Sequence, residues 1–499
     1  MNEVKKMIEK SVKQATRLFH EGNLAACQLL IEQTLKVEPH NDEALQIAGL
    51  LKLRTGNTLD AITLLQKARS NNAENPDHHN NLALAYSRVG KYDEAMQCAK
   101  TAISMAPGRQ VFWTNYGVQL RNKACAKPIP ENERNELLNE CEKAFMKALE
   151  INSNSTSTMS NLASLYAERH DMKVAAEWFE KALTIDDSLS GIHVDLSYVY
   201  FLNGENKKAW KHYEHRMAHY PQANRWEKVF PSSKRWDGQT SLEDKIVLVF
   251  CEQGCGDSIH FARYLSLLKT KKTLICCHEP LKELLSQFGE TYEMGQKSPQ
   301  YDISIPIMSL PFLLNDPKTK NSYIEAPKPA NLSKYDQTLK IGICWAGNPQ
   351  HPGDRFRSIP LNFLSVLSSP KHTLFSLQKD YRPRKYHDGE EAIDLCSNGP
   401  KIIDLSYMMS NFEETAKYIM AMDLVVSVDT AILHLTGSLG KKGCALLPYS
   451  PDWRWGLKGE KTDLYPSLTL LRQPEKNDWN SVIKKLKDIV SLEKISLQE

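Results

Sequence analysis

Small and apolar residues recur every 34 positions over the first 220 residues of the chain. Gly56 and Gly90 are 34 residues apart, and so are Ala61 and Ala95. A period of this length, with small residues at the helix contacts, predicts a solenoid of helical hairpins. About six copies fit before residue 220, which is enough to bury a continuous core by stacking.

The copy at residues 76–109 has the fullest pattern. It has apolar and small residues on two helices, a glycine between them and a closing proline, at Leu82, Ala83, Tyr86, Gly90, Tyr92, Ala95, Ala99, Ala102 and Pro107. This copy resembles the tetratricopeptide repeat. A later copy fits only if about twelve residues around 123–134 are inserted at its turn. The aromatic residues are interpreted as core, and the concave face as a recognition surface for an extended peptide or a partner protein.

Helical periodicity is lost at residues 221–243, where proline, glycine and serine predict a linker. Trp226 and Trp236 are candidates for pinning it to a neighbour. Beyond the linker, apolar runs of strand length alternate with helical stretches. Strands are expected at 245–251, 273–277, 301–306, 341–347, 372–378, 401–405, 424–429, 443–448 and 468–473. Helices are expected at 281–288 and 412–422. The alternation predicts two α/β lobes with mostly parallel sheets, at 244–335 and 336–499, the second ending in a helix. A cleft between two such lobes suits a two-substrate enzyme.

The first strand of the α/β region ends in a glycine-rich turn that carries a carboxylate. Gln253, Gly254 and Gly256 lead into Asp257, where a helix is expected to begin. Ligands bind in α/β sheets at such strand ends. A dinucleotide fingerprint is not favoured because Ile259 stands where its third glycine belongs. Asp257 alone is more often a helix cap than a catalyst.

The strand expected at 424–429 ends in a second turn of this kind. Ser427, Asp429 and Thr430 precede a predicted helix that carries His434 one turn in. The amides at such a helix start form a ready anion site. Asp429 as a cap and His434 as a packed core residue are the simpler interpretations of each residue alone.

A loop rich in glycine and proline follows the strand at 341–347. It carries His351, Arg355, Arg357 and Ser358, and paired arginines suit a diphosphate through forked hydrogen bonds. The ends of two later strands add polar and aromatic residues to the same rim, namely Gln378, Lys379, Asp452, Trp453, Arg454 and Trp455. Lys379 is equally well explained as a surface lysine. The tryptophans are candidates for stacking on a base or sugar, with packing the simpler role for at least one.

Composition narrows the class of protein. The chain has 499 residues, is 41% hydrophobic and 25% charged, and its net charge is only +3, so nucleic-acid binding is not indicated. We expect a cytoplasmic protein, because the N-terminus lacks an apolar signal core and no run of about eighteen apolar residues occurs. The 11 cysteines are scattered, and Cys251, Cys255 and His260 lack a second ligand pair at zinc spacing, so no metal is expected.

Five ordered blocks carry a family resemblance: EQGCGDSIHFARY, CWAGNPxHxxDRFRSI, SLQK, SVDTAxxHLxGxLG and LLPYSPDWRW. They are similar to those of bacterial tetratricopeptide-repeat glycosyltransferases, whose catalytic half is similar to the ADP-heptose heptosyltransferases. The resemblance implies a repeat solenoid followed by a double Rossmann-like GT-B module. It also implies inverting, metal-independent sugar transfer from a nucleotide-sugar bound mainly by the C-terminal lobe.

Carried over by residue, the resemblance makes Asp257 the general base. Asp429, Thr430 and His434 would line the donor diphosphate. Ala431 departs from the glycine usual in heptosyltransferases, and Cys255 from an aliphatic residue usual in the relatives with repeats. The first departure weakens the diphosphate assignment slightly.

The expected acceptor is a protein captured by the repeats, such as flagellin or another surface polypeptide. A non-catalytic repeat adaptor with a degenerate transferase module is the alternative, although the motif blocks keep their charged residues. Transfer to a lipid-linked lipopolysaccharide core is a third reading, disfavoured because no basic amphipathic helix for a membrane surface is evident. The sequence leaves open the sugar, the nucleotide, the acceptor and whether the repeats form a homo-oligomer.

Overall fold

The computed structural model of the chain describes residues 2–126, 129–220, 223–297, 299–351, 353–379, 385–386, 390–391 and 402–493. The chain divides into two compact units, Met1–Ile192 and His193–Glu499. The first unit is helical, and the second contains both parallel sheets. The predicted repeat solenoid and the predicted parallel α/β region are therefore both confirmed.

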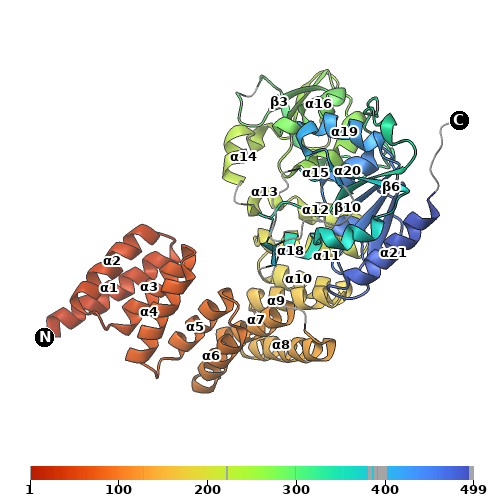
Figure 1. Ribbon diagram of the computed structural model, residues 1–499. Coiled ribbons are helices and arrows are strands. Elements are labelled where there is room, and N and C mark those ends of the chain that lie inside the picture. The colour runs from red at the N-terminus through yellow and green to blue at the C-terminus, as the bar shows by residue number, and fades with distance from the viewer. Residues whose placement is uncertain are drawn as a thin grey trace. The chain divides into compact units, whose positions relative to one another are not determined.

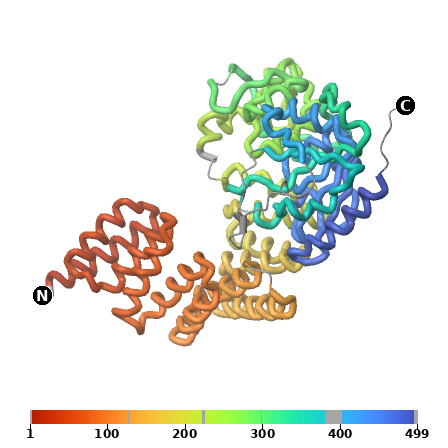
Figure 2. The backbone as a smooth tube through the Cα atoms, in the orientation of Figure 1, coloured from red at the N-terminus to blue at the C-terminus, as the bar shows by residue number. Residues whose placement is uncertain are grey.

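The repeat region consists of helix pairs, and from α1 to α10 each helix packs on its successor (Figures 1 and 2). Within its described residues these helices are α1 (Asn2–His20), α2 (Leu24–Val37), α3 (Asp42–Arg54), α4 (Thr58–Asn71), α5 (Pro76–Arg88), α6 (Tyr92–Met105), α7 (Gln110–Ala126), α8 (Glu131–Ile151), α9 (Thr156–Glu168), α10 (Met172–Ile185), α11 (Ser190–Leu202) and α12 (Asn206–Tyr213). Most of α11, from His193 onward, and the whole of α12 belong to the second unit.

The turns inside the pairs explain the recurring glycines. Gly22, Gly56, Gly90 and Gly204 have φ values between +75° and +84°, a left-handed conformation that favours glycine. His170 takes this place in the fifth pair, with φ of +60°. The 34-residue period therefore has two causes: the positive φ that each turn requires, and the small residues needed where the helices contact each other.

The insertion expected in the fourth pair lengthens its helices. The helices α7 and α8 have 17 and 21 residues, against 13 and 14 in α5 and α6. Residues 127–128 of the predicted insertion lie outside the described residues. Gly117 lies against Phe145 so closely that an added Cβ would be 2.5 Å from the ring, which shows how tightly this pair packs.

The segment predicted as a linker contains a short helix. It includes α14 (Ala223–Val229), which follows α13 (Arg216–His219). Trp226 and Phe230 are buried against the first sheet, and the Phe230 ring stacks on Phe250 with centroids 4.3 Å apart. Trp226 therefore pins this segment to the α/β region.

The first sheet is parallel and has the order β3-β2-β1-β4. Its strands are β1 (Ile246–Phe250), β2 (Lys272–Cys277), β3 (Glu290–Glu293) and β4 (Ile303–Pro306). The edge strand β3 was not predicted, because its sequence Glu-Thr-Tyr-Glu has no apolar run. The helix expected at 281–288 is shorter, with α16 at Lys282–Leu285 between single turns of 3₁₀ helix.

The second sheet is also parallel and has the order β12-β11-β10-β5-β6-β9. Its strands are β5 (Leu339–Cys344), β6 (His372–Ser376), β9 (Ile402–Asp404), β10 (Leu424–Val428), β11 (Gly443–Leu447) and β12 (Leu468–Arg472). Every predicted strand of this lobe is present in its described residues. Lys401, at the start of one predicted strand, lies outside them.

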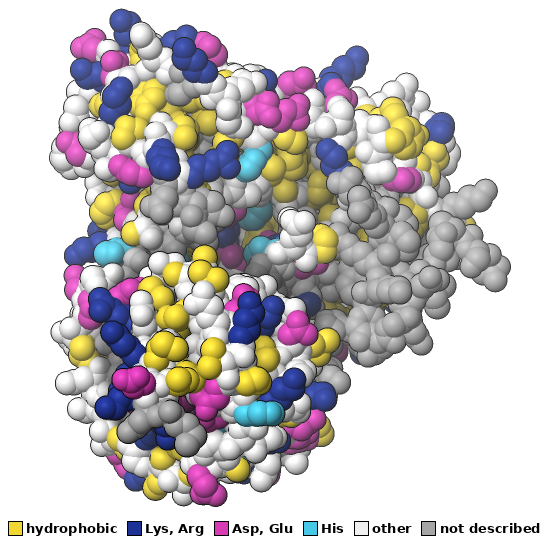
Figure 3. All heavy atoms as spheres, turned by 90° about the vertical axis from the view of Figure 1, so that its left-hand side faces the viewer, with side chains coloured by type: hydrophobic (Ala, Val, Ile, Leu, Met, Phe, Trp, Pro, Cys, Tyr) yellow, Lys and Arg dark blue, Asp and Glu magenta, His cyan; other side chains and the backbone are white. Residues whose placement is uncertain are grey.

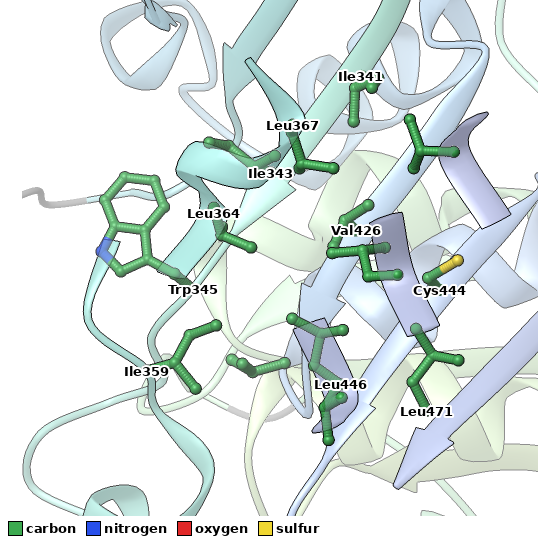
Figure 4. Close-up of a cluster of buried hydrophobic side chains, with 14 of the residues drawn as sticks. Ile341, Ile343, Trp345, Ile359, Leu364, Leu367, Val426, Cys444, Leu446 and Leu471 are labelled. Carbon is green, nitrogen blue, oxygen red and sulfur yellow. The ribbon is translucent and has the colours of Figure 1, made fainter. Parts of the chain in front are cut away.

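Apolar side chains from the central strands fill the core under this sheet. Ile341, Ile343, Val426 and Leu446 are at most 1% exposed and pack together with Leu471 (Figure 4). The helix α21 (Trp479–Leu492) adds further buried side chains to the same cluster. Burial on both faces explains why these strands read as continuous apolar runs.

Candidate functional site

The second unit contains a cleft of about 860 Å³ between the carboxyl ends of its two sheets. Most of the predicted site residues line it: Gln253, Gly254, Gly256, Asp257, His351, Arg357, Gln378, Lys379, Asp429, Thr430, His434, Asp452, Trp453 and Arg454. Residues that are far apart in sequence meet here because parallel strands end at one edge of each sheet.

Three predicted residues are not among those that line the cleft. The Ser358 hydroxyl is buried, accepts from the Gly347 amide at 2.9 Å and donates to Asp354 at 2.8 Å, so it fixes the loop. The buried Ser427 hydroxyl donates to the Val428 carbonyl at 2.7 Å. The Arg355 guanidinium lies over the Phe356 ring, 4.5 Å from its centroid. Of the two arginines predicted to bind a diphosphate, only Arg357 lines the cleft.

Asp257 lies inside a helix and not at its start. The helix α15 (Cys255–Phe261) begins two residues earlier, with Gly254 as its N-cap. The Asp257 Oδ2 accepts from the Gly254 amide at 3.1 Å, and its Oδ1 accepts from the Arg454 Nη2 at 2.6 Å. Its side chain remains 25% exposed. The carboxylate thus stabilises the helix start, holds an arginine of the other sheet and still faces the cleft.

The surroundings of Asp257 push its proton affinity in opposite directions. Burial raises the pKa of Asp257, the Arg454 guanidinium lowers it, and the neighbouring Asp452 carboxylate raises it further. Arg454 also donates to Asp452 at 2.9 Å, so one buried cation serves two carboxylates. The net effect is a carboxylate more basic than an exposed aspartate, which suits proton abstraction.

Helices from the two sheets meet beside the cleft, because α15 packs on α20 (Ala431–Ser438). A Cβ on Gly256 would lie 3.2 Å from the His434 ring and 3.4 Å from the Ala431 Cα. A glycine in the first turn therefore permits the close approach. The alanine at position 431, where the heptosyltransferase pattern has glycine, packs directly against this turn.

A buried tyrosine joins the two helices. The Tyr465 hydroxyl lies 3.0 Å from the His260 Nδ1 and 3.1 Å from the His434 Nδ1. Burial, together with nearby arginines, lowers the pKa of both histidines well below the usual range, so both are neutral. His434 thus packs as a core residue, the simpler of the two interpretations, and also lines the cleft.

The start of α20 lies at the cleft, where the sequence predicted an anion site. Thr430, and not Asp429, is the N-cap of this helix, and the Thr430 hydroxyl lies 3.1 Å from the Ser427 hydroxyl. Asp429 lies 3.9 Å from the His434 Nε2. Burial and the neighbouring Asp452 raise the pKa of Asp429. The first amides of the helix present positive partial charge to this part of the cleft.

Arg357 is held tightly by its loop. Its Nε lies 3.5 Å from the Asp354 carboxylate, and its guanidinium packs so close to Gly347 that a Cβ there would be 2.7 Å from Nη2. The short helix α18 (Asp354–Arg357) presents it to the cleft. Packing of this kind positions a guanidinium in advance for a phosphate.

The two tryptophans are packed. The Trp453 ring stacks on Phe201 with centroids 4.0 Å apart, and Arg454 lies over it at 4.5 Å. Trp455 is 3% exposed and stacks on His434 at 5.3 Å. The interpretation of this pair as a platform for a base or sugar is not supported, because neighbouring side chains already contact the rings.

Two residues at the end of β6 have different roles. The Gln378 side chain is 7% exposed and accepts from the Ala346 amide at 3.0 Å, so it orders the neighbouring strand end. The Lys379 ammonium donates to the Ser410 carbonyl at 3.3 Å. Both line the cleft.

The sequence did not reveal three tyrosines that line the cleft. Tyr198, Tyr213 and Tyr220 come from α11, α12 and the segment after α13. The Tyr198 and Tyr220 hydroxyls are 3.1 Å apart, and the Gln253 amide donates to the Tyr213 hydroxyl at 3.3 Å. The repeat pattern assigned Tyr213 to the solenoid core and did not single out Tyr198 or Tyr220, and no local signal marks the position of the three at the cleft.

Metal-binding groups and membrane-spanning helices were also sought among the described residues. They contain no group of three or more His, Cys, Asp or Glu side chains that could hold a metal ion. None of their helices is long and apolar enough to cross a membrane. On the face shown in Figure 3, basic side chains are interspersed with acidic ones, in keeping with the small net charge.

Comparisons with known proteins support the repeats. Tetratricopeptide repeat models match residues 48–109 and 155–185. Protein FlbA of Caulobacter vibrioides is 22% identical over 502 aligned residues, which cover 92% of this chain and 80% of FlbA. Similar solved structures include a thermophilic repeat protein of Thermus thermophilus (16% identity, TM-score 0.34, covering 38% of this chain and 95% of that one) and PilF of Pseudomonas aeruginosa (14%, 0.35, 45% and 96%).

Proposed function

We propose that this protein is a glycosyltransferase of GT-B type that transfers a sugar from a nucleotide-sugar to an acceptor hydroxyl. One observation carries the proposal: a carboxylate of raised pKa, Asp257, lines the same cleft as a helix start and an arginine suited to a diphosphate, Thr430 and Arg357. General base and phosphate-binding groups on one cleft are what such a transfer needs.

The proposed reaction is a single inverting displacement. Asp257 accepts the proton of the acceptor hydroxyl while the hydroxyl oxygen bonds to the anomeric carbon. The bond between that carbon and the diphosphate oxygen breaks, and the nucleoside diphosphate leaves with the electron pair. The first amides of α20 and the Arg357 guanidinium stabilise its negative charge, so the proposal needs no metal.

A protein is the proposed acceptor. Tetratricopeptide repeats commonly bind protein partners, and the repeats here precede the α/β region in the same chain. Binding a polypeptide on the repeats would raise the effective concentration of its hydroxyl groups near the cleft. Flagellin or another surface polypeptide is the class of acceptor that we propose.

Calorimetric titration of the full chain with a panel of nucleotide-sugars tests the donor site. We expect one of them to bind, and Arg357→Gln to weaken its binding by roughly ten- to a hundredfold, because a charge-assisted hydrogen bond contributes about 1.5 to 3 kcal/mol. Arg355→Gln is the matched control, since Arg355 does not line the cleft and should leave binding unchanged. If the folded protein binds none of the panel, the adaptor alternative becomes the better explanation.

Donor binding should strengthen as pH falls from 8 to 5.5. Burial raises the pKa of Asp429 to about 6, so this carboxylate is charged and repels the diphosphate at pH 8 but is largely neutral at pH 5.5. The diphosphate of a nucleotide-sugar does not titrate in this range, so the change belongs to the protein. We expect up to about a tenfold gain in affinity by calorimetry. Asp429→Asn should bind tightly at both pH values, and an unchanged pH dependence in that variant would refute the assignment.

A further inference from the structure

The last helix pair of the repeats packs on the loop that carries Arg454. The Phe201 ring of α11 stacks on the Trp453 ring, with centroids 4.0 Å apart and planes 18° from parallel. The Trp210 ring of α12 meets both edge-on, with its centroid 4.4 Å from that of Phe201 and 5.5 Å from that of Trp453. Phe201 and Trp210 are buried, and Trp453 lines the cleft. All three belong to the unit that contains the two sheets, so one aromatic cluster joins these helices to the cleft.

The Arg454 guanidinium is enclosed by aromatic rings and by two carboxylates. Its central carbon lies 4.5 Å from the Trp453 ring centroid and 5.6 Å from that of Phe261. It donates to Asp452 at 2.9 Å and to Asp257 at 2.6 Å, and the Arg454 side chain is only 7% exposed. Cation–π attraction strengthens when the cation is removed from water. The rings therefore help to fix the guanidinium from which Asp257 accepts.

The orientation of the Asp257 carboxylate depends on this guanidinium. One carboxylate oxygen accepts from the Gly254 amide at 3.1 Å, and the other accepts from Arg454. Burial raises the pKa of Asp257, and the Arg454 guanidinium lowers it. If Arg454 shifted, the carboxylate would lose one of these two bonds and would keep its proton to a higher pH. A displaced Arg454 would therefore leave the proposed base both misaligned and protonated.

We infer that Phe201 and Trp453 are positioning residues for the proposed general base and act on it through Arg454. The contacts run from Phe201 to Trp453, from Trp453 to Arg454 and from Arg454 to Asp257. The inference rests on the proposed function, and it adds that the last helix pair of the repeats helps to build the site of transfer. If the rings served packing alone, their loss would lower stability and leave the carboxylate unchanged.

Other titratable groups lie near Asp257 and Arg454. Besides Asp452 they are Tyr213, Cys255, His260, His351, Asp429 and His434. Burial raises the pKa of the tyrosine and of the cysteine, and it lowers the pKa of the three histidines. Burial also raises the pKa of Asp429 to about 6, so this group titrates in the range of a pH–rate profile. The test therefore needs a signal that belongs to the Asp257 carboxyl alone.

Titration of the Asp257 carboxyl carbon by ¹³C NMR of the full chain provides this signal, which Asp257→Asn identifies by its absence. We expect Arg454→Met to move the midpoint up by about one to three pH units, the usual effect of losing a neighbouring arginine. Phe201→Leu and Trp453→Leu should each produce part of this shift, about half a pH unit or more. The acidic limb of the single-turnover rate profile at saturating donor should move with it. Trp453→Phe keeps a ring over Arg454 and should keep the wild-type midpoint.

Phe230→Leu is the matched control. Phe230 is a buried ring of the same unit and stacks on Phe250 of β1, with centroids 4.3 Å apart, rather than on a neighbour of Arg454. The substitution should lower the melting temperature about as much as Phe201→Leu does. It should leave the Asp257 midpoint unchanged.

Folded Phe201→Leu and Trp453→Leu variants with a wild-type Asp257 midpoint would overturn the inference and leave the rings a packing role only. The two substitutions remove one stack from its two sides, so a single folded variant decides the test, and the partly exposed Trp453 is the milder site. A shifted midpoint in a protein that transfers sugar from none of the donors would reject the transferase and keep the positioning role. Transfer with unshifted midpoints would reject only the positioning role.

Discussion

Asp257→Asn is expected to slow sugar transfer by about a hundredfold or more, the usual contribution of a positioned general base. An asparagine cannot accept the hydroxyl proton. It also offers one oxygen where the aspartate uses two, for the Gly254 amide and for Arg454, so some loss of stability should accompany the loss of rate. The rate is measured under single-turnover conditions with saturating donor, and the melting temperature is recorded alongside it.

Asp452→Asn is the matched control for this prediction. Asp452 bonds to the same guanidinium, and neutralising it alters the charge around Arg454 in the same way, but it is not the proposed base. We expect its transfer rate to fall by less than about tenfold. Equal rates in the two variants would mean that Asp257 acts only by holding Arg454 and the helix start. Both variants should still bind the nucleotide-sugar.

Much of the fold follows from local patterns. Strands that are buried on both faces have continuous apolar sequences. The positions of β1, β10 and β11 were predictable for this reason, because each is such an apolar run. The turn glycines of the repeats were equally visible, because their positive φ limits the choice of residue. The edge strand β3 was not predicted because none of its four residues is buried, so it has no apolar run.

The candidate site was only partly predictable, because it depends on contacts between distant segments. The turns at Asp257 and Thr430 are local, so the sequence placed both. The ion pair between Asp257 and Arg454 is not local, since it requires the two sheets to meet at a particular angle. The packing of Trp453 is also non-local. Its ring stacks on Phe201, which belongs to a segment that the repeat pattern assigned to the solenoid.

Arg216→Met is expected to destabilise the second unit by about 3 to 5 kcal/mol, the usual effect of removing one partner from a buried ion pair. Arg216 is fully buried and bonds to Glu214, Glu252 and Ser309. Methionine fills part of the volume but leaves the Glu252 carboxylate buried without a counter-charge. Chemical denaturation, followed at a signal from the α/β region, measures the change in unfolding free energy.

The pH dependence of this loss identifies its cause. An unpaired buried carboxylate has a folded-state pKa above its unfolded value, so the penalty is present at neutral pH and shrinks as pH falls through the folded-state pKa. We therefore expect Arg216→Met to lose less stability at pH 5.5 than at pH 7.5, and the added Glu252→Gln substitution to recover part of the loss at pH 7.5. Arg235→Met, which breaks a more exposed pair with Glu227, should cost no more than about 1 kcal/mol. A loss for Arg216→Met that is independent of pH would point to lost packing as the cause.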